Sequence, residues 1–158
     1  MNMGKVPHED LEGIDDAKMR AVFDLNVFGV LYMSRAAVPE LKKSQGCIIN
    51  ITSSAGIRPG GSSMPYSMSK AAVNHMTKMM AKSQGPEVRV CAVAPSLTNT
   101  KMMASEKFAA KKAKIAGMAP LKRIAEPEDM GEAVLGIWRC KYMTGAVVVV
   151  DGGFSLVA

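Results

Sequence analysis

Tyr66 and Lys70 are the two residues whose types and spacing point most directly to acid–base chemistry. Residues four apart in a helix lie on one face, one turn from each other. A phenol has a pKa near about 10, and a neighbouring ammonium favours the phenolate. We therefore expect Lys70 to lower the pKa of Tyr66 and make it a usable acid or base. Alone the pair is a weak signal, because helix surfaces carry such pairs by chance.

Two further polar residues stand in apolar surroundings. Ser53 lies 13 positions before Tyr66, directly after the apolar run CIINIT, and therefore at the end of a predicted strand. Ser54 is the neighbouring alternative. Asn26 interrupts the apolar stretch LNVFGV of a predicted helix, where an amide needs a partner or a role.

The pattern of apolar residues predicts the elements that position these side chains. Steps of three and four residues indicate helices, and short unbroken β-branched runs indicate strands buried on both faces. Helices and strands of this kind alternate along the chain, which predicts one α/β domain over residues 1–158. Its sheet is expected to be parallel and doubly wound, with helices on both faces. The helices are expected at 15–41, 66–82 and 103–116 and from Glu126 onward, and the strands at 47–52, 88–94 and 146–151. Ligands gather where such strands end, here at TSSAG, PSLTNT and DGG.

Composition excludes several classes of function. The net charge is +6, and its densest source, EKFAAKKAKIAG, is interpreted as the solvated face of a surface helix. Aromatic residues do not alternate with these lysines, so we expect no nucleic acid as partner. No apolar run approaches the ~20 residues of a membrane span, and the first residues show no secretory signal, so no membrane is expected. Three scattered cysteines predict neither a disulfide framework nor a metal site, and they favour the reducing cytoplasm.

Six segments, taken in their order along the chain, carry a resemblance of this sequence to a known family. They are NVFGV, GCIINITSSAG, YSMSKAAV, RVCAVAPSLTNTKM, PLKRIAEPEDM and YMTGAVVVVDGG. From about residue 11 to residue 154 the chain resembles the second half of a short-chain dehydrogenase/reductase. The resemblance implies a partial Rossmann-like sheet, NAD or NADP as cofactor without a choice between them, and hydride transfer between nicotinamide and a carbonyl or secondary alcohol.

The resemblance also implies roles for the residues near Tyr66. Tyr66 would be the general acid in carbonyl reduction and the base in alcohol oxidation. Ser53, which the spacing favours over Ser54, would orient the reacting oxygen. Lys70 would hold the nicotinamide ribose hydroxyls, and Asn26 would help to hold a water molecule that links Lys70 to solvent.

The loop PSLTNT would carry the rest of the cofactor contacts. Pro95 and Ser96 would form a wall beside the nicotinamide, although Ser96 replaces the glycine usual in the family. The backbone of Thr98 and the hydroxyl of Thr100 would bind its carboxamide or the diphosphate. Together with Tyr66 and Lys70, these residues complete the expected cofactor site.

The sequence departs from the family at one major point. It contains no strand, glycine-rich turn and helix of the kind that receives a pyrophosphate, so the first βαβαβ half is expected to be missing. Two hypotheses follow. The chain is either an oxidoreductase with its catalytic residues on this half, or an inactive fragment that associates through its two long helices. A small-molecule substrate and a homo-oligomer are the expected partners.

Overall fold

The core of the protein is a sheet of parallel strands, described in a computed structural model that covers residues 11–59 and 62–157. Its strands are β1 (Cys47–Ile51), β2 (Arg89–Pro95) and β3 (Val147–Val150), in the order β1-β2-β3. Both pairings are parallel, with Ile49 opposite Cys91 and Val93 opposite Val148. The predicted strands are confirmed to within one residue at each end, and so is the α/β class.

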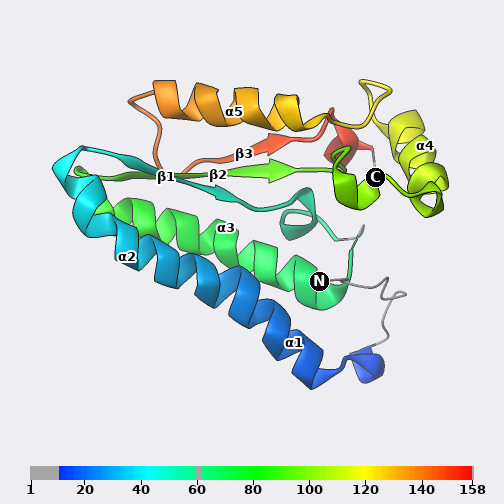
Figure 1. The fold of residues 1–158 in the computed structure, drawn as a ribbon, viewed down its shortest axis with the longest axis horizontal. Coiled ribbons are helices and arrows are strands. Elements are labelled where there is room, and N and C mark those ends of the chain that lie inside the picture. Colours follow the sequence, from blue (N-terminus) through cyan, green and yellow to red (C-terminus); the bar gives the residue numbers. More distant parts are fainter. Residues whose placement is uncertain (1–10, 60–61, 158) are drawn as a thin grey trace.

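Helices cover both faces of this sheet. In the described part the α-helices are α1 (Asp16–Phe23), α2 (Gly29–Lys43), α3 (Met64–Gln84), α4 (Ala109–Met118) and α5 (Pro127–Arg139). Figure 1 shows α5 on one face and α2 and α3 on the other, while α4 lies beyond the carboxyl ends of the strands. The helix that carries Asn26 packs beside α3, as expected.

The central strand β2 explains why the apolar runs do not alternate. Its residues from Val90 to Ala94 are at most 1% exposed. One side of the strand packs with Ala81 of α3, and the other packs with Ile137 of α5. A strand buried on both faces needs apolar residues at every position. Of the free cysteines, Cys91 fills this core, whereas Cys140 is exposed.

The long helix predicted at 15–41 is present but is not uniform. It begins after Asp15, whose carboxylate accepts hydrogen bonds from the backbone N–H groups of Ala17 and Lys18. The five residues Asp24–Phe28, which include Asn26, form a π-helical turn between α1 and α2. Such turns are rare and often occur at functional sites. The pattern of apolar residues did not predict it, because one extra residue in a turn barely disturbs the helical period.

The predicted helix at 103–116 is wrong at its start. Two 3-10 turns, Lys101–Met103 and Glu106–Phe108, come before α4. Ser105 between them has an extended backbone, which interrupts the helix. The first ten residues, where the sequence predicts no secretory signal, lie outside the described residues.

By length and composition, the continuous helix Asp16–Lys43 could cross a membrane. It has 28 residues, the mean hydropathy of an 18-residue window within it is 1.3, and 6% of that window is buried. The length of the apolar runs did not predict this, because Asp24 and Arg35 interrupt the apolar run. Helices that pack against other protein surfaces meet the same two criteria, and here α1 contacts α3.

A buried polar pair joins β1 to α3. The Asn50 amide donates to Thr77 Oγ1 at 2.9 Å, and that hydroxyl donates to the Val73 carbonyl oxygen at 2.8 Å. Thr77 is fully buried. A buried amide that loses its partner bears the whole cost of desolvation. This pair therefore fixes how α3 sits against the strand that leads to Ser53.

The variant Thr77→Val tests this link, because it keeps the shape of the side chain but removes the acceptor of the Asn50 amide. We expect a loss of about 1–3 kcal/mol in the free energy of unfolding, measured by urea denaturation followed by circular dichroism. The control Thr77→Ser keeps the hydroxyl and should lose only about 1 kcal/mol for one buried methyl group. Equal stability of the Val and Ser variants would contradict the assignment.

Candidate active site

The carboxyl end of β1 directs Ser53 toward α3. Thr52 holds the strand end in place, because its N–H and its hydroxyl both donate to the Val93 carbonyl oxygen, at 2.8 and 3.1 Å. Ser53 follows in an extended conformation, and a 3-10 turn, Ser54–Gly56, begins directly after it. The Ser53 hydroxyl accepts a hydrogen bond from Ala55 N–H at 3.2 Å. The hydroxyl therefore has a fixed place at the start of this turn.

The turn packs directly on the backbone of α3. A Cβ atom at Gly56 would lie 2.6 Å from the Lys70 carbonyl carbon, closer than real Cβ contacts come. The Asn74 amide donates to the Gly56 carbonyl oxygen at 3.1 Å. Asn74 was not among the predicted residues, although an amide between Val73 and His75 on a packed helix was a usable signal. It acts on the site through Gly56, as a positioning residue.

Tyr66 stands in the first turn of α3, opposite Ser53. Ser63 caps the helix by accepting from Tyr66 N–H at 3.4 Å, and Pro65 occupies the first turn, as predicted. The Ser53 hydroxyl hydrogen-bonds the Tyr66 side chain. Ser54, the alternative, lies buried within the 3-10 turn. The structure therefore brings Ser53 and Tyr66 together.

Lys70 lies beside the Tyr66 ring. Its ammonium is 5.6 Å from the ring centroid and donates to the Ile51 carbonyl oxygen at 3.1 Å. An ammonium has three donors, so this bond leaves others for sugar hydroxyls. Lys70 thus connects the end of β1 with the helix that carries Tyr66.

Burial shifts the pKa values of both Tyr66 and Lys70. It raises the pKa of the Tyr66 phenol above 10.0, and the hydrogen bond from Ser53 opposes part of that shift. It also lowers the pKa of the Lys70 ammonium. The expectation that Lys70 lowers the pKa of Tyr66 is therefore wrong for this structure. Loss of solvent penalises the phenolate, and the opposing effect comes from Ser53 rather than from Lys70.

Asn26 reaches the site through Ser69. Its amide donates to Ser69 Oγ at 3.1 Å, and Ser69 Oγ donates to the Tyr66 carbonyl oxygen at 2.7 Å. Ser69 is fully buried and directly precedes Lys70. These two hydrogen bonds, from Asn26 to Ser69 and from Ser69 to the Tyr66 backbone, therefore connect the π-helical turn to α3. Ser69 was not predicted, because serine is common on helix surfaces.

The predicted cofactor loop follows β2 at the same edge of the sheet. Pro95 is the last residue of the strand, and Ser96 N–H donates to the Val150 carbonyl oxygen at 3.3 Å. Thr98 forms an isolated parallel bridge with Ala125. Thr100 is exposed and begins the next 3-10 turn. The loop is thus held by backbone bonds to β3 and to the segment before α5.

These residues fit the nicotinamide end of a dinucleotide. The half-buried Lys70 ammonium retains donors for a ribose, and the exposed Thr100 hydroxyl suits an amide or a phosphate. The printed sequence has no glycine-rich turn for the pyrophosphate. Within residues 11–59 and 62–157, no group of His, Cys, Asp and Glu side chains is arranged to hold a metal ion.

Comparison with known proteins identifies the family. Residues 1–155 match the family profile described as Enoyl-(Acyl carrier protein) reductase. Ketoacyl reductase 2 of the granaticin polyketide synthase, from Streptomyces violaceoruber, is 42% identical over 153 residues, which cover 96% of this chain and 61% of that protein. The short-chain dehydrogenase/reductase homolog YusR of Bacillus subtilis is 39% identical over 129 residues, covering 81% of this chain and 98% of its own length. The chain belongs to the short-chain dehydrogenase/reductase family.

Solved structures agree with this assignment. The aldohexose dehydrogenase of Thermoplasma acidophilum superposes with a TM-score of 0.88 at 27% identity, over 99% of this chain and 67% of that one. A 3-oxoacyl-[acyl-carrier protein] reductase of Brucella melitensis with bound NAD gives a TM-score of 0.80 at 26% identity, over 92% and 55%. The chain thus spans little more than half the length of several relatives, 61% in the granaticin reductase.

The Ser53–Tyr66 contact predicts a measurable titration. Because the Ser53 hydrogen bond opposes the rise caused by burial, Ser53→Ala should raise the pKa of Tyr66 further above 10.0. The measurement is the ultraviolet absorbance of the phenolate against pH, with the curve of Tyr66→Phe subtracted to remove the other tyrosines. Ser54→Ala is the matched control and should leave the midpoint in place. A midpoint that falls in Ser53→Ala would contradict the geometry.

Proposed function

We propose that this chain carries the catalytic residues of an oxidoreductase that uses NAD or NADP to interconvert a carbonyl and a secondary alcohol. The observation that supports it is the hydroxyl pair of Ser53 and Tyr66 at the carboxyl edge of the sheet, with the Lys70 ammonium beside the Tyr66 ring. Two relatives are named as reductases of ketoacyl or 3-oxoacyl groups, so a 3-oxoacyl thioester is the first substrate to test. The three free thiols suit a cytoplasmic location.

Each residue then has a definite task. The nicotinamide, when bound, supplies the hydride for reduction or accepts it in oxidation. The Ser53 hydroxyl donates a hydrogen bond to the substrate oxygen and sets its direction. Tyr66 donates its phenolic proton to that oxygen as negative charge develops there. Because burial raises the pKa of Tyr66, the proton stays on the phenol until the alkoxide forms.

The same contacts suggest how Tyr66 regains its proton. Lys70 lies over the ring, and its pKa is lowered by burial, so it releases a proton more readily than an exposed lysine. Asn26 is anchored one residue away, on Ser69. In this proposal Asn26 helps to hold water near Lys70, and the loop from Pro95 to Thr100 positions the nicotinamide.

The 158-residue chain on its own should bind NADH and NADPH very weakly and reduce ketones negligibly. Lys70 and Thr100 contact only the nicotinamide end, and each ~1.4 kcal/mol of lost contact costs tenfold in affinity. Cofactor fluorescence measures binding, and loss of absorbance with a panel of ketones and 3-oxoacyl thioesters measures turnover. Micromolar binding with turnover that Tyr66→Phe abolishes would show that the chain is sufficient as it stands.

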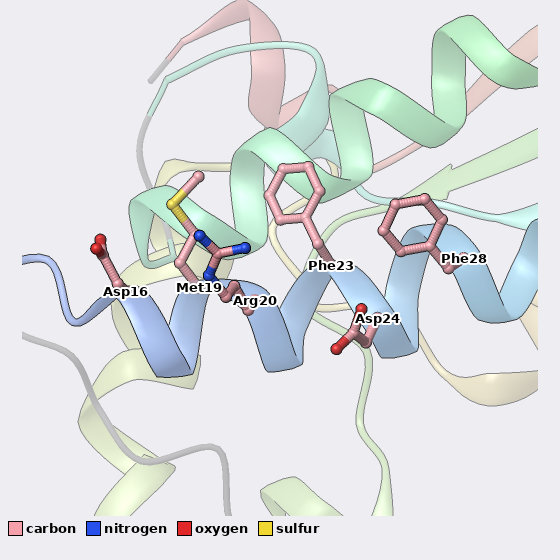
Figure 2. Close-up of a pocket in the computed structure, with 6 residues that line it drawn as sticks. All are labelled: Asp16, Met19, Arg20, Phe23, Asp24 and Phe28. Carbon is pink, nitrogen blue, oxygen red and sulfur yellow. The ribbon is translucent and has the colours of Figure 1, made fainter.

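A second candidate role, association through the long helices, has its own support. The apolar flank, as we call the exposed apolar residues of the first long helix, consists of Leu25, Phe28, Leu31, Tyr32 and Met33. Phe28 and Tyr32 stack with their ring centroids 6.2 Å apart. A hollow of about 470 Å³ adjoins them, and Figure 2 shows Phe23 and Phe28 pointing toward α3 and Asp24 pointing away from it. Large exposed apolar patches mark association surfaces, which favours a homo-oligomer.

The double variant Leu25→Glu and Tyr32→Glu should reduce self-association, because it places charge in the middle of the apolar flank. Sedimentation velocity over a range of concentrations measures the oligomeric state, and we expect a shift from dimer or larger species toward monomer. Leu135→Glu with Tyr142→Glu is the matched control, since both side chains are exposed and lie outside the apolar flank, Leu135 on α5 and Tyr142 in the loop that follows it. An unchanged distribution in the first variant would exclude the apolar flank as the interface.

A further inference from the structure

Arg58 is a charged side chain to which the proposed function gives no task. It is half-buried at the end of the turn that follows β1, and its Nε atom is buried. Within residues 11–59 and 62–157 that atom has no hydrogen-bond partner, while Nη1 donates to the Pro59 carbonyl oxygen at 3.1 Å. Burial of part of a guanidinium without a full set of partners is costly, so we expect another contact to compensate.

The ring of Phe154 supplies such a contact. The central carbon of the Arg58 guanidinium lies over this ring, 4.5 Å from the ring centroid. A cation at this distance is attracted by the face of an aromatic ring, and the attraction is stronger where solvent is excluded. The contact joins two segments that lie far apart in the sequence, the turn after β1 and the turn after β3.

The segment after β3 holds Phe154 in a fixed place. The 3-10 turn Phe154–Leu156 begins after Gly153, whose φ of 82° is left-handed. The Asp151 carboxylate accepts hydrogen bonds from Gly153 N–H at 2.9 Å and from Ser155 N–H at 2.8 Å. These bonds fix the chain where it turns back after β3, and the ring of Phe154 is fixed with it.

The Arg58–Phe154 contact crosses the carboxyl end of β2. In the sheet β2 lies between β1 and β3, which do not pair with each other. Neighbouring strands are about 4.8 Å apart, so the segments that follow β1 and β3 start about 10 Å from each other. The Arg58 charge also reaches Asp151. Burial raises the pKa of this carboxyl, but hydrogen bonds with Ser155 and Gly153 and the charge of Arg58 hold it below 3.8.

The backbone of Arg58 closes the turn that carries Ser53. We name residues 53–58 the Ser53 turn. Within it, Arg58 N–H donates to the Ser54 carbonyl oxygen at 3.1 Å, and Gly56 N–H donates to the Ser53 carbonyl oxygen at 3.0 Å. Gly56 anchors the Ser53 turn on α3, and Arg58 anchors it on the segment after β3. The turn is therefore held at two points that belong to different elements.

We propose that Arg58 is a positioning residue, which holds the Ser53 turn on Phe154 and so keeps the Ser53 hydroxyl against Tyr66. The meaning of that hydroxyl pair for hydride chemistry rests on the proposed function. The positioning does not, because it concerns a hydrogen bond that the chain forms by itself. The ring contact is thus a second support of the site, separate from the packing on α3.

The phenolate titration of Tyr66 measures the Ser53 hydrogen bond without turnover. The absorbance of the 158-residue chain is followed against pH, and each variant is corrected with its own Tyr66→Phe partner. Phe154→Leu removes the ring but keeps the Arg58 charge and an apolar side chain. This variant should raise the pKa of Tyr66 in the same direction as Ser53→Ala, and by about half as much or more.

A double-mutant cycle shows whether the effect passes through Ser53. In a Ser53→Ala background, Phe154→Leu should cause no further change, because the hydrogen bond to Tyr66 is already lost. Equal shifts with and without the Ser53 hydroxyl would overturn the proposal, and so would a Tyr66 midpoint that stays in place or falls. A purely structural contact would lower the melting temperature of Phe154→Leu and leave that midpoint unchanged.

Two controls separate this contact from general effects of substitution. Phe154→Tyr keeps the ring face and should leave the Tyr66 midpoint in place. Trp138→Leu removes a ring that lies under the Lys141 ammonium at 4.8 Å, near the end of α5, and should also leave it in place. Circular dichroism confirms that the variants are folded. A shift in Trp138→Leu as large as that in Phe154→Leu would overturn the proposal.

Arg58→Gln approaches the same contact from its other side and does not alter the segment after β3. It should also raise the pKa of Tyr66, and the rise in the double variant with Phe154→Leu should be smaller than the sum of the two. Full additivity would contradict the proposal. Cofactor and substrate take no part in these titrations. Failure of hydride chemistry would therefore leave the positioning result intact, and failure of the titration would leave the acid role of Tyr66 intact.

Discussion

The close approach of the turn after β1 to the backbone of α3 is the constraint on which the site depends. Gly56 has no room for a side chain against Lys70, and Asn74 holds the Gly56 carbonyl from the same helix. One contact thereby fixes Ser53 relative to Tyr66, although 12 residues separate them in sequence. The buried bond between Asn50 and Thr77 secures the same strand and helix further along. The geometry of the candidate site and the packing of the core thus depend on the same interface, between β1 and α3.

Burial has opposite effects on the two titratable groups of this interface. It raises the pKa of Tyr66 and lowers that of Lys70, so it favours the neutral form of both. The folded chain binds the phenolic proton more tightly than the unfolded chain. The stability contributed by Tyr66 is therefore present below pH 10.0 and is lost as the pH rises through the folded pKa. In the proposed function, a phenol that holds its proton in this way suits the role of acid in carbonyl reduction.

Sequence alone was enough for the strands and for the place of Ser53 at a strand end, because each followed from a local signal. Apolar runs gave β1 to β3, and the end of CIINIT placed Ser53 at a strand end. The residues that sequence missed, Ser69 and Asn74, act through contacts between elements, which no local pattern records. The predicted direction of the shift in the Tyr66 pKa was wrong for a related reason. Spacing shows that Lys70 is near, whereas only packing shows how much solvent is lost.

The central claim is that Tyr66 and Ser53 act together on one substrate oxygen. The most direct test joins this chain to the part of the granaticin ketoacyl reductase that it does not cover, and follows NADH and NADPH oxidation with a 3-oxoacyl thioester. Our account predicts turnover that falls about 100-fold or more in Tyr66→Phe, as expected for loss of a general acid, and clearly in Ser53→Ala but not in Ser54→Ala. Turnover that persists undiminished in Tyr66→Phe would contradict it.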